Sequence, residues 1–141
     1  MKYVLDSSVA FKWALREVDT DKALRLRDEA RNGVHELLAP DVFPIELGHA
    51  LTRAERQGRI AAPDGWAAWL AVMGDAPLLH PSLPLIPRAY TLSSQARIGI
   101  YDCLYVALAD REGCQLLTAD ARLISGLQKQ YPFIVELSSL P

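Results

Sequence analysis

Two aspartates directly follow apolar segments that have the length and composition of buried strands. Asp6 comes after the run YVL at residues 3–5, and Asp120 comes shortly after the run CQLLT at residues 114–118. A buried strand does not normally end in a carboxylate unless the carboxylate has a partner or a chemical role. We therefore treat both residues as candidates for metal binding or acid–base chemistry.

Two further acids lie near the start of predicted helices. Glu46 follows Pro44, which is well placed to open a helix, and Asp102 stands near the start of the otherwise apolar segment IYDCLYVALA. A simpler explanation for each acid is stabilisation of a helix N-terminus, which contributes about 0.3–1 kcal/mol. Four acids placed in this way favour a shared site over four separate caps.

Convergence of four carboxylates has a strong electrostatic consequence. Two carboxylates about 5 Å apart repel by roughly 3 kcal/mol at an effective dielectric constant near 20. The acids must therefore take up protons or bind a hard cation, and ligands that are all oxygen suit Mg²⁺ or Mn²⁺. Zinc fits poorly, because His35, His49 and His80 are isolated from one another. Carboxylate-bound Mg²⁺ or Mn²⁺ is typical of phosphodiester cleavage.

The elements that must position these acids alternate between short apolar runs and helical stretches. We predict helices from Ser8 to Leu15, from Thr20 as N-cap to Gly33, from Pro44 to Gly58, and over 63–74, 85–97, 100–113 and 119–130. The predicted strands are 3–5, 36–39, 77–80, 114–118 and 133–137. This order indicates an α/β fold, a three-layer α/β/α sandwich around a parallel sheet of about five strands. In such sheets ligands bind beyond the carboxyl ends of the strands, where Asp6 and Asp120 are expected.

Composition indicates one domain over residues 1–141, with a net charge of −2 that gives no general basic field. Cys103 and Cys114 are expected to be reduced residues in apolar surroundings. The segment before Asp6 has too few apolar residues for a signal peptide, and the longest uncharged apolar stretch, 65–74, is too short to span a bilayer. We therefore expect a cytoplasmic protein that does not enter the membrane.

Four stretches of the chain resemble the motif segments of PIN-domain ribonucleases, and especially of VapC toxins from type II toxin–antitoxin systems. They are YVLDSSVAFKW, PIELGHAL, YDCLYVALADREG and LLTADARL. The resemblance implies a Mg²⁺- or Mn²⁺-dependent endoribonuclease in which Asp6, Glu46, Asp102 and Asp120 are the four motif acids. It implies that Asp6, Asp102 and Asp120 hold the metal and that Glu46 binds metal or orients water.

The resemblance also implies supporting residues and partners. Thr118 matches a hydroxyl position that supports the acids, and Ser8 is expected to act similarly, with helix capping as the alternative for both. The expected partners are RNA, a second copy of the chain and a VapB-type antitoxin whose tail directs a basic side chain to the acids.

Other functions explain fewer of these residues. An aspartyl-phosphate phosphatase usually has a second Asp two positions after the first, where this chain has Ser8. A di-iron site needs two Glu-x-x-His pairs, and only Glu46 and His49 form one. A Mg²⁺-binding signalling or protein-binding module is the remaining alternative, but it leaves Glu46 and Asp102 without a role.

Basic and aromatic residues complete the set of candidates. The basic residues that could meet RNA phosphates are Lys12, Arg16, Arg53, Arg56 and Arg97, although a solvated surface position is the simpler expectation for each. Packing is the expected role of Trp13 and of Tyr101 and Tyr105 beside Asp102. Trp66 and Trp69 share one helix face, where packing or a dimer contact is expected and base stacking is the alternative.

Overall fold

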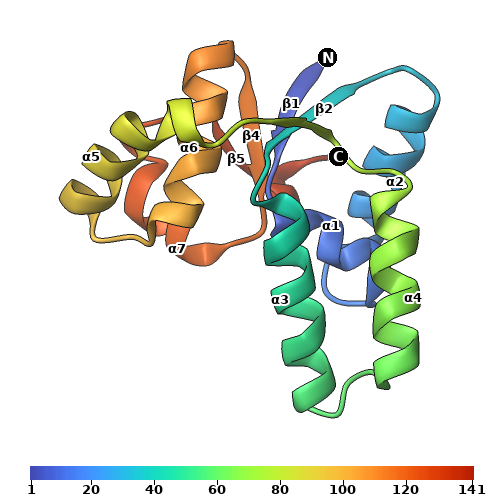
Figure 1. Ribbon diagram of the computed structural model, residues 1–141. Helices are drawn as coiled ribbons and strands as arrows, with labels where there is room; N and C mark the ends of the chain where they lie inside the picture. The colour runs from blue at the N-terminus through green and yellow to red at the C-terminus, as the bar shows by residue number, and fades with distance from the viewer.

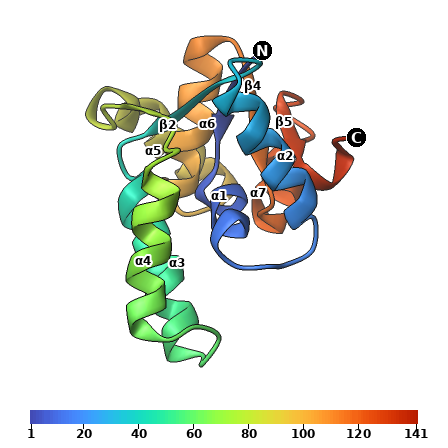
Figure 2. The same cartoon turned by 90° about the vertical axis from the view of Figure 1, so that its right-hand side faces the viewer.

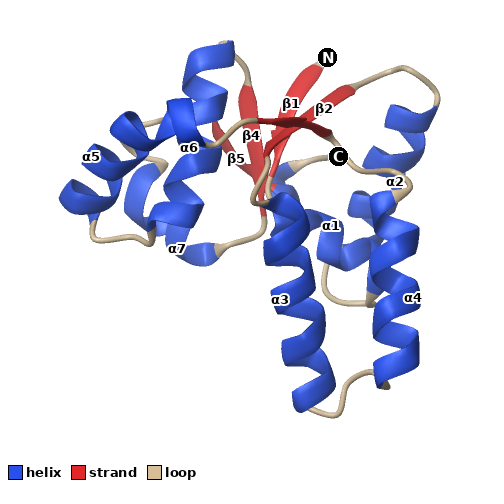
Figure 3. Cartoon of the chain, viewed as in Figure 1, coloured by secondary structure: helices blue, strands red, loops and turns tan.

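A five-stranded parallel sheet forms the centre of the computed structural model, which describes residues 1–141. Its strands stand in the order β3-β2-β1-β4-β5 (Figure 3). Their bounds are β1 Lys2–Leu5, β2 Glu36–Pro40, β3 Leu78–His80, β4 Gln115–Thr118 and β5 Ile134–Glu136. The predicted fold class, with its five parallel strands, is confirmed.

Helices cover both faces of this sheet (Figure 1). The group that contains α1 Ser7–Ala14, α2 Thr20–Arg31, α3 Phe43–Arg56 and α4 Ala62–Met73 lies on one side. The other side carries α5 Ile86–Ala96, α6 Ile100–Glu112 and α7 Ala121–Leu127. Short 3₁₀ turns at Leu83–Leu85 and Leu137–Ser139 precede α5 and follow β5.

Helix α6 is the most deeply buried helix of the fold. Residues 103–109 are all buried, because α6 lies between the sheet and α5. A helix that is apolar on every side is expected in such a place. Asp102 is the polar residue at the start of this buried stretch, so its position at the edge of the core is fixed by the packing of the whole helix.

Helices α3 and α4 form an antiparallel arm that extends beyond the sheet (Figure 2). The indole nitrogen of Trp69 donates a hydrogen bond of 3.0 Å to the Pro44 carbonyl, which joins α4 to the first turn of α3. Trp66 and Trp69 share a helix face as predicted, and their rings stack with centroids 5.2 Å apart. Trp69 packs against the core, whereas Trp66 is 61% exposed and is not buried as expected. The arm positions Glu46 at its base, next to the sheet.

Two local predictions were wrong. Thr20 does not cap α2; Asp19 holds the N-cap position in a left-handed conformation, and Thr20 Oγ1 instead accepts the Glu17 N–H at 2.8 Å. Tyr101 was expected to pack, but it is 58% exposed, because its side chain leaves α6 on the side away from the core. Tyr105, one turn later, is fully buried. Both cysteines are free thiols.

None of the helices has both the length and the apolar character that a membrane-spanning helix requires.

Candidate active site

The sheet topology brings the carboxyl ends of β1 and β4 together. The two strands pair directly, with Leu5 opposite Leu117, so Asp6 and Asp120 follow neighbouring strands at the same edge. Helix α1 leaves β1 toward one face of the sheet, and α7 leaves β4 toward the other (Figure 1). A crevice opens where successive connections separate in this way.

All four predicted acids line one cavity of about 340 Å³ at this crevice. Glu46 reaches it from the first turn of α3, and Asp102 reaches it from the first turn of α6. The other lining residues are Ser7, Ser8, Phe11, Lys12, Glu17, His49, Ala50, Arg53, Ala119 and Arg122.

Asp6 is the most buried acid of the cavity, with 3% of its surface exposed. It stands at the N-cap position of α1 but makes no side-chain capping bond. Its Oδ2 atom instead accepts hydrogen bonds of 2.7 Å from both Ser8 Oγ and Thr118 Oγ1. Burial raises the pKa of Asp6, the two hydroxyls lower it, and nearby Asp120 raises it. The Asp6 carboxyl is therefore either protonated or stabilised by positive charge from the cavity side.

The two hydroxyls connect Asp6 to the backbone that follows β4. Ser8 Oγ accepts the Ala119 N–H at 3.0 Å, and Thr118 Oγ1 accepts the Asp120 N–H at 3.0 Å. Each hydroxyl thus accepts a hydrogen bond from a backbone N–H and donates one to the Asp6 carboxylate. Neither Ser8 nor Thr118 caps a helix, so the capping alternative does not describe them.

Glu46 has an unpaired oxygen. Its Oε1 atom is buried without a hydrogen-bond partner, and so is the hydroxyl of the neighbouring Tyr105. Burial raises the pKa of Glu46 to about 7; the Tyr105 hydroxyl lowers it, and Asp6, Asp102 and Asp120 raise it further. No hydrogen bond of normal geometry joins the hydroxyl to the carboxylate, although the two groups interact electrostatically.

Asp102 and Asp120 are the more accessible acids. Burial, followed by the charges of Asp6 and Asp120, raises the pKa of Asp102 to about 6, and Arg122 opposes this shift. Asp120 caps α7, because its Oδ1 atom accepts the Arg122 N–H at 2.9 Å. For Asp120 the capping alternative thus holds at Oδ1, while Oδ2 lies 3.5 Å from Arg122 Nη2.

The chemistry of this lining fits a hard divalent cation. Five carboxylates, those of Glu17 and the four predicted acids, line a cavity in which His49 is the only nitrogen-donor ring and no cysteine is present. The acids are not preassembled, since no three His, Cys, Asp or Glu side chains are close enough together to form a finished metal site.

Basic side chains line the same cavity. Of the five that the sequence suggested, Lys12 and Arg53 belong to the lining, whereas Arg16, Arg56 and Arg97 do not. Lys12 Nζ lies 3.3 Å from a Glu17 carboxylate oxygen. Arg122 was missed by the sequence analysis, although its place two residues after a motif acid at the start of a helix was an available signal.

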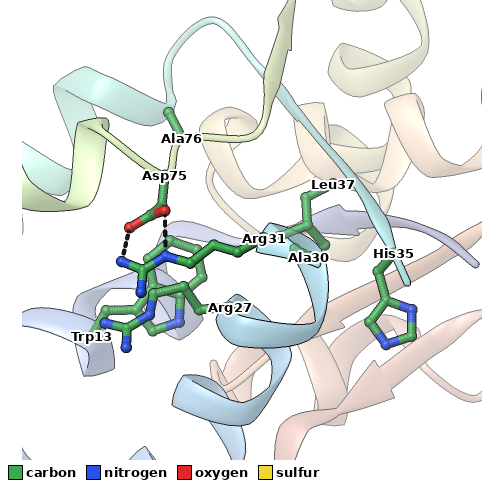
Figure 4. A pocket seen from close by; sticks show the side chains of 8 residues that line it. All are labelled: Trp13, Arg27, Ala30, Arg31, His35, Leu37, Asp75 and Ala76. Carbon is green, nitrogen blue, oxygen red and sulfur yellow. Dashed lines mark hydrogen bonds and ion pairs between the residues drawn. The ribbon is translucent and has the colours of Figure 1, made fainter. Parts of the chain in front are cut away.

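Another cavity, of about 210 Å³, has a different character (Figure 4). Arg31 crosses it and forms a bidentate ion pair with Asp75, with nitrogen–oxygen distances of 2.7 and 2.6 Å. The pair joins the end of α2 to the segment after α4. Because each charge is already compensated, we assign this cavity a structural role.

Comparison with known proteins defines the class to which this fold and site belong. Residues 3–126 match the PIN domain family, so the chain belongs to that family. Within it, the chain is 33% identical over 99 residues to ribonuclease VapC9 of Mycobacterium tuberculosis, covering 70% of this chain and 76% of that protein. It is 38% identical over 87 residues to ribonuclease VapC1 of the same species, covering 60% of this chain and 63% of that protein.

Solved structures share the fold at lower sequence identity. A protein from Pyrobaculum aerophilum superimposes with a TM-score of 0.72 at 19% identity, over 99% of this chain and 85% of that one. VapBC2 from Rickettsia felis, solved with a DNA fragment from its promoter, gives 0.64 at 15% identity over 96% and 97% of the two chains. VapC20 of M. tuberculosis, described as a toxin that cleaves the sarcin-ricin loop, gives 0.63 at 14% identity over 88% and 95%.

Proposed function

We propose that this chain is the toxin of a type II toxin–antitoxin system and acts as a Mg²⁺- or Mn²⁺-dependent endoribonuclease. The observation that carries the proposal is the single cavity lined by Asp6, Glu46, Asp102 and Asp120 at the crevice between β1 and β4. The VapC relatives, which are named ribonucleases, support RNA as the substrate.

Each acid has a distinct part in this proposal. Asp6, Asp102 and Asp120 would hold the cation, and Glu46, which lines the same cavity, would orient the attacking water. Ser8 and Thr118 support the site by holding Asp6 in place. A bound Mg²⁺ or Mn²⁺ supplies positive charge that lowers the pKa of the attacking water and neutralises charge on the phosphate oxygens.

The basic lining residues position the substrate. Arg53 on α3 and Lys12 on α1 line the same cavity as the acids, where they would meet phosphates next to the cleaved bond. Because water rather than the ribose 2′-hydroxyl is the nucleophile, the products carry 5′-phosphate and 3′-hydroxyl ends. A 2′,3′-cyclic phosphate in the products would contradict this mechanism.

The partners proposed are a VapB-type antitoxin and a second copy of the chain. A VapBC pair is among the solved structures that share the fold. Exposed apolar side chains on β3, the following turn and α5 favour self-association, namely Leu78, Leu79, Leu83 and Tyr90. Light scattering during size-exclusion chromatography should give twice the 15.6 kDa mass of the chain.

Purified protein and RNA sequencing test the proposal. The wild type should cleave RNA when Mg²⁺ or Mn²⁺ is added and lose the activity with EDTA. Asp6→Asn should lose cleavage and keep its fold, because the buried carboxylate is replaced by a side chain of the same shape. Asp21→Asn is the matched control, since Asp21 is exposed and lies outside the cavity.

Growth after induced expression gives an independent readout. Wild-type expression should arrest growth, and Asp6→Asn should not. Cation binding without cleavage of any cellular RNA would instead favour a Mg²⁺-binding signalling or protein-binding module.

A further inference from the structure

Arg122 forms ion pairs with two of the cavity acids, Asp102 and Asp120. Its Nη2 atom lies 3.9 Å from Asp102 Oδ2 and 3.5 Å from Asp120 Oδ2. Its backbone N–H also donates to Asp120 Oδ1 at 2.9 Å. One residue therefore engages both oxygens of Asp120 and one oxygen of Asp102.

No other basic side chain compensates these acids. Arg122 is the only residue that forms ion pairs with the four predicted acids, since Lys12 pairs with Glu17, a fifth acid of the lining, and Arg53 pairs with none. The positive charge that the acids need is thus partly supplied by the chain itself.

The Arg122 guanidinium is bound weakly enough to be displaced from Asp102 and Asp120. Both distances are longer than those of a charge-assisted hydrogen bond, and the Arg122 side chain is 79% exposed. Ion pairs of this kind are weak, because solvent screens them and a long side chain must be held still. The hydrogen bond from the Arg122 backbone N–H to Asp120 Oδ1 does not depend on where the guanidinium points.

We propose that Arg122 is the resident counter-cation of Asp102 and Asp120, and that a divalent cation must displace its guanidinium to fill the cavity. Arg122 thereby sets the cation concentration at which the site fills. This inference rests on the proposed function, because it requires the acids to bind Mg²⁺ or Mn²⁺. The guanidinium and the divalent cation repel each other and compete for the same Oδ2 atoms, so the two do not occupy them together.

Titration calorimetry with Mn²⁺ tests this competition on the purified, EDTA-treated chain. Arg122→Gln removes the charge and keeps the backbone N–H that holds Asp120. It should bind Mn²⁺ roughly threefold to tenfold more tightly than the wild type, as expected for the loss of two weak ion pairs. The gain should shrink as NaCl is raised, because salt already screens the wild-type pairs.

Arg16→Gln is the matched control, because Arg16 is 73% exposed, pairs with Asp21 at 3.3 Å and lies outside the cavity lining. Its Mn²⁺ affinity should stay within about twofold of the wild type, since exposed charges outside the site are screened. Equal or weaker Mn²⁺ binding by Arg122→Gln, or the same gain in Arg16→Gln, would overturn the inference.

The result that would disprove the proposed function differs from the result that would disprove only the role of Arg122. If the wild type binds no Mn²⁺, or if Asp6→Asn binds it equally well, the cation site itself is wrong and the inference falls with it. If the wild type binds Mn²⁺ through Asp6 but Arg122→Gln does not bind it more tightly, only the role of Arg122 is overturned.

Discussion

Glu46 combines an unpaired buried oxygen with a pKa raised from 4.5 to about 7, mainly by burial. The native state therefore holds this proton more tightly than the unfolded chain does. Between pH 4.5 and about 7 the native state binds more protons, so the contribution of Glu46 to the free energy of unfolding falls as pH rises through this window.

Glu46→Gln should remove this pH dependence. Without divalent cations, the variant should gain about 1–2 kcal/mol of stability relative to the wild type between pH 4 and pH 8, a value reduced from the full shift because Glu46 is partly solvated. Urea unfolding at several pH values measures the difference. Glu36→Gln, at an exposed glutamate outside the cavity, is the control. A constant difference between wild type and Glu46→Gln at every pH would contradict the prediction.

Tyr105 carries a buried hydroxyl without a hydrogen bond, directly beside Glu46. Because an unsatisfied buried hydroxyl is costly, Tyr105→Phe should stabilise the cation-free protein by about 1 kcal/mol. The same change should lower the cleavage rate near neutral pH, since the Tyr105 hydroxyl lowers the pKa of Glu46 and its loss leaves more of that carboxyl protonated. Thermal unfolding and RNA cleavage are measured together, with exposed Tyr101→Phe as the control. A less stable Tyr105→Phe protein would mean that the hydroxyl is structural.

At the scale of single residues, the sequence allowed the acids to be predicted but not their surroundings. Asp6 and Asp120 stand out because each follows an apolar strand. The pairing of Ser8 with Thr118 across 110 positions, and the reach of Arg122 over Asp102, depend on two elements meeting in space. No local pattern encodes such contacts, so the hydroxyls were suggested only by family resemblance and Arg122 was not found.

At the scale of elements, hydrophobic periodicity located every strand and helix, and errors were confined to their ends. Gly33 and Gly58 end α2 and α3 with positive φ angles, as expected where a helix ends in the left-handed region. The start of α2 was misplaced because the left-handed Asp19 uses the N-cap position, a conformation uncommon for a residue with a side chain.

The arm offers a test of element packing at Gly48, in the middle of α3. A Cβ atom there would lie 3.8 Å from Trp69 Nε1, an ordinary van der Waals contact. Gly48→Ala should therefore add helix propensity without strain, stabilising the protein by about 1 kcal/mol and raising the melting temperature by about 2–4 °C. Gly58→Ala should instead destabilise it, because φ is +73° there. A Gly48→Ala protein that melts below the wild type would show that α3 and α4 pack more tightly than described.

At the scale of the whole molecule, the strand order β3-β2-β1-β4-β5 explains why acids far apart in the sequence meet. The chain moves outward from β1 to β3 with its helices on one face, then crosses to β4 and continues to β5 with helices on the other (Figure 1). The order of the strands thus changes direction between β1 and β4, and the acids come from connections on both sides of this point. Binding one cation would therefore connect both helical layers.

That arrangement predicts that a cation stabilises the entire fold against unfolding. At Mn²⁺ concentrations a hundredfold above the dissociation constant, the wild type should gain about 2.7 kcal/mol in the free energy of unfolding, because only the native chain assembles the four acids. Asp6→Asn should gain little, whereas Asp21→Asn should gain as much as the wild type. Differential scanning calorimetry with and without Mn²⁺ measures these shifts. An equal gain in Asp6→Asn would mean that Mn²⁺ acts elsewhere on the molecule and that the crevice between β1 and β4 does not hold it.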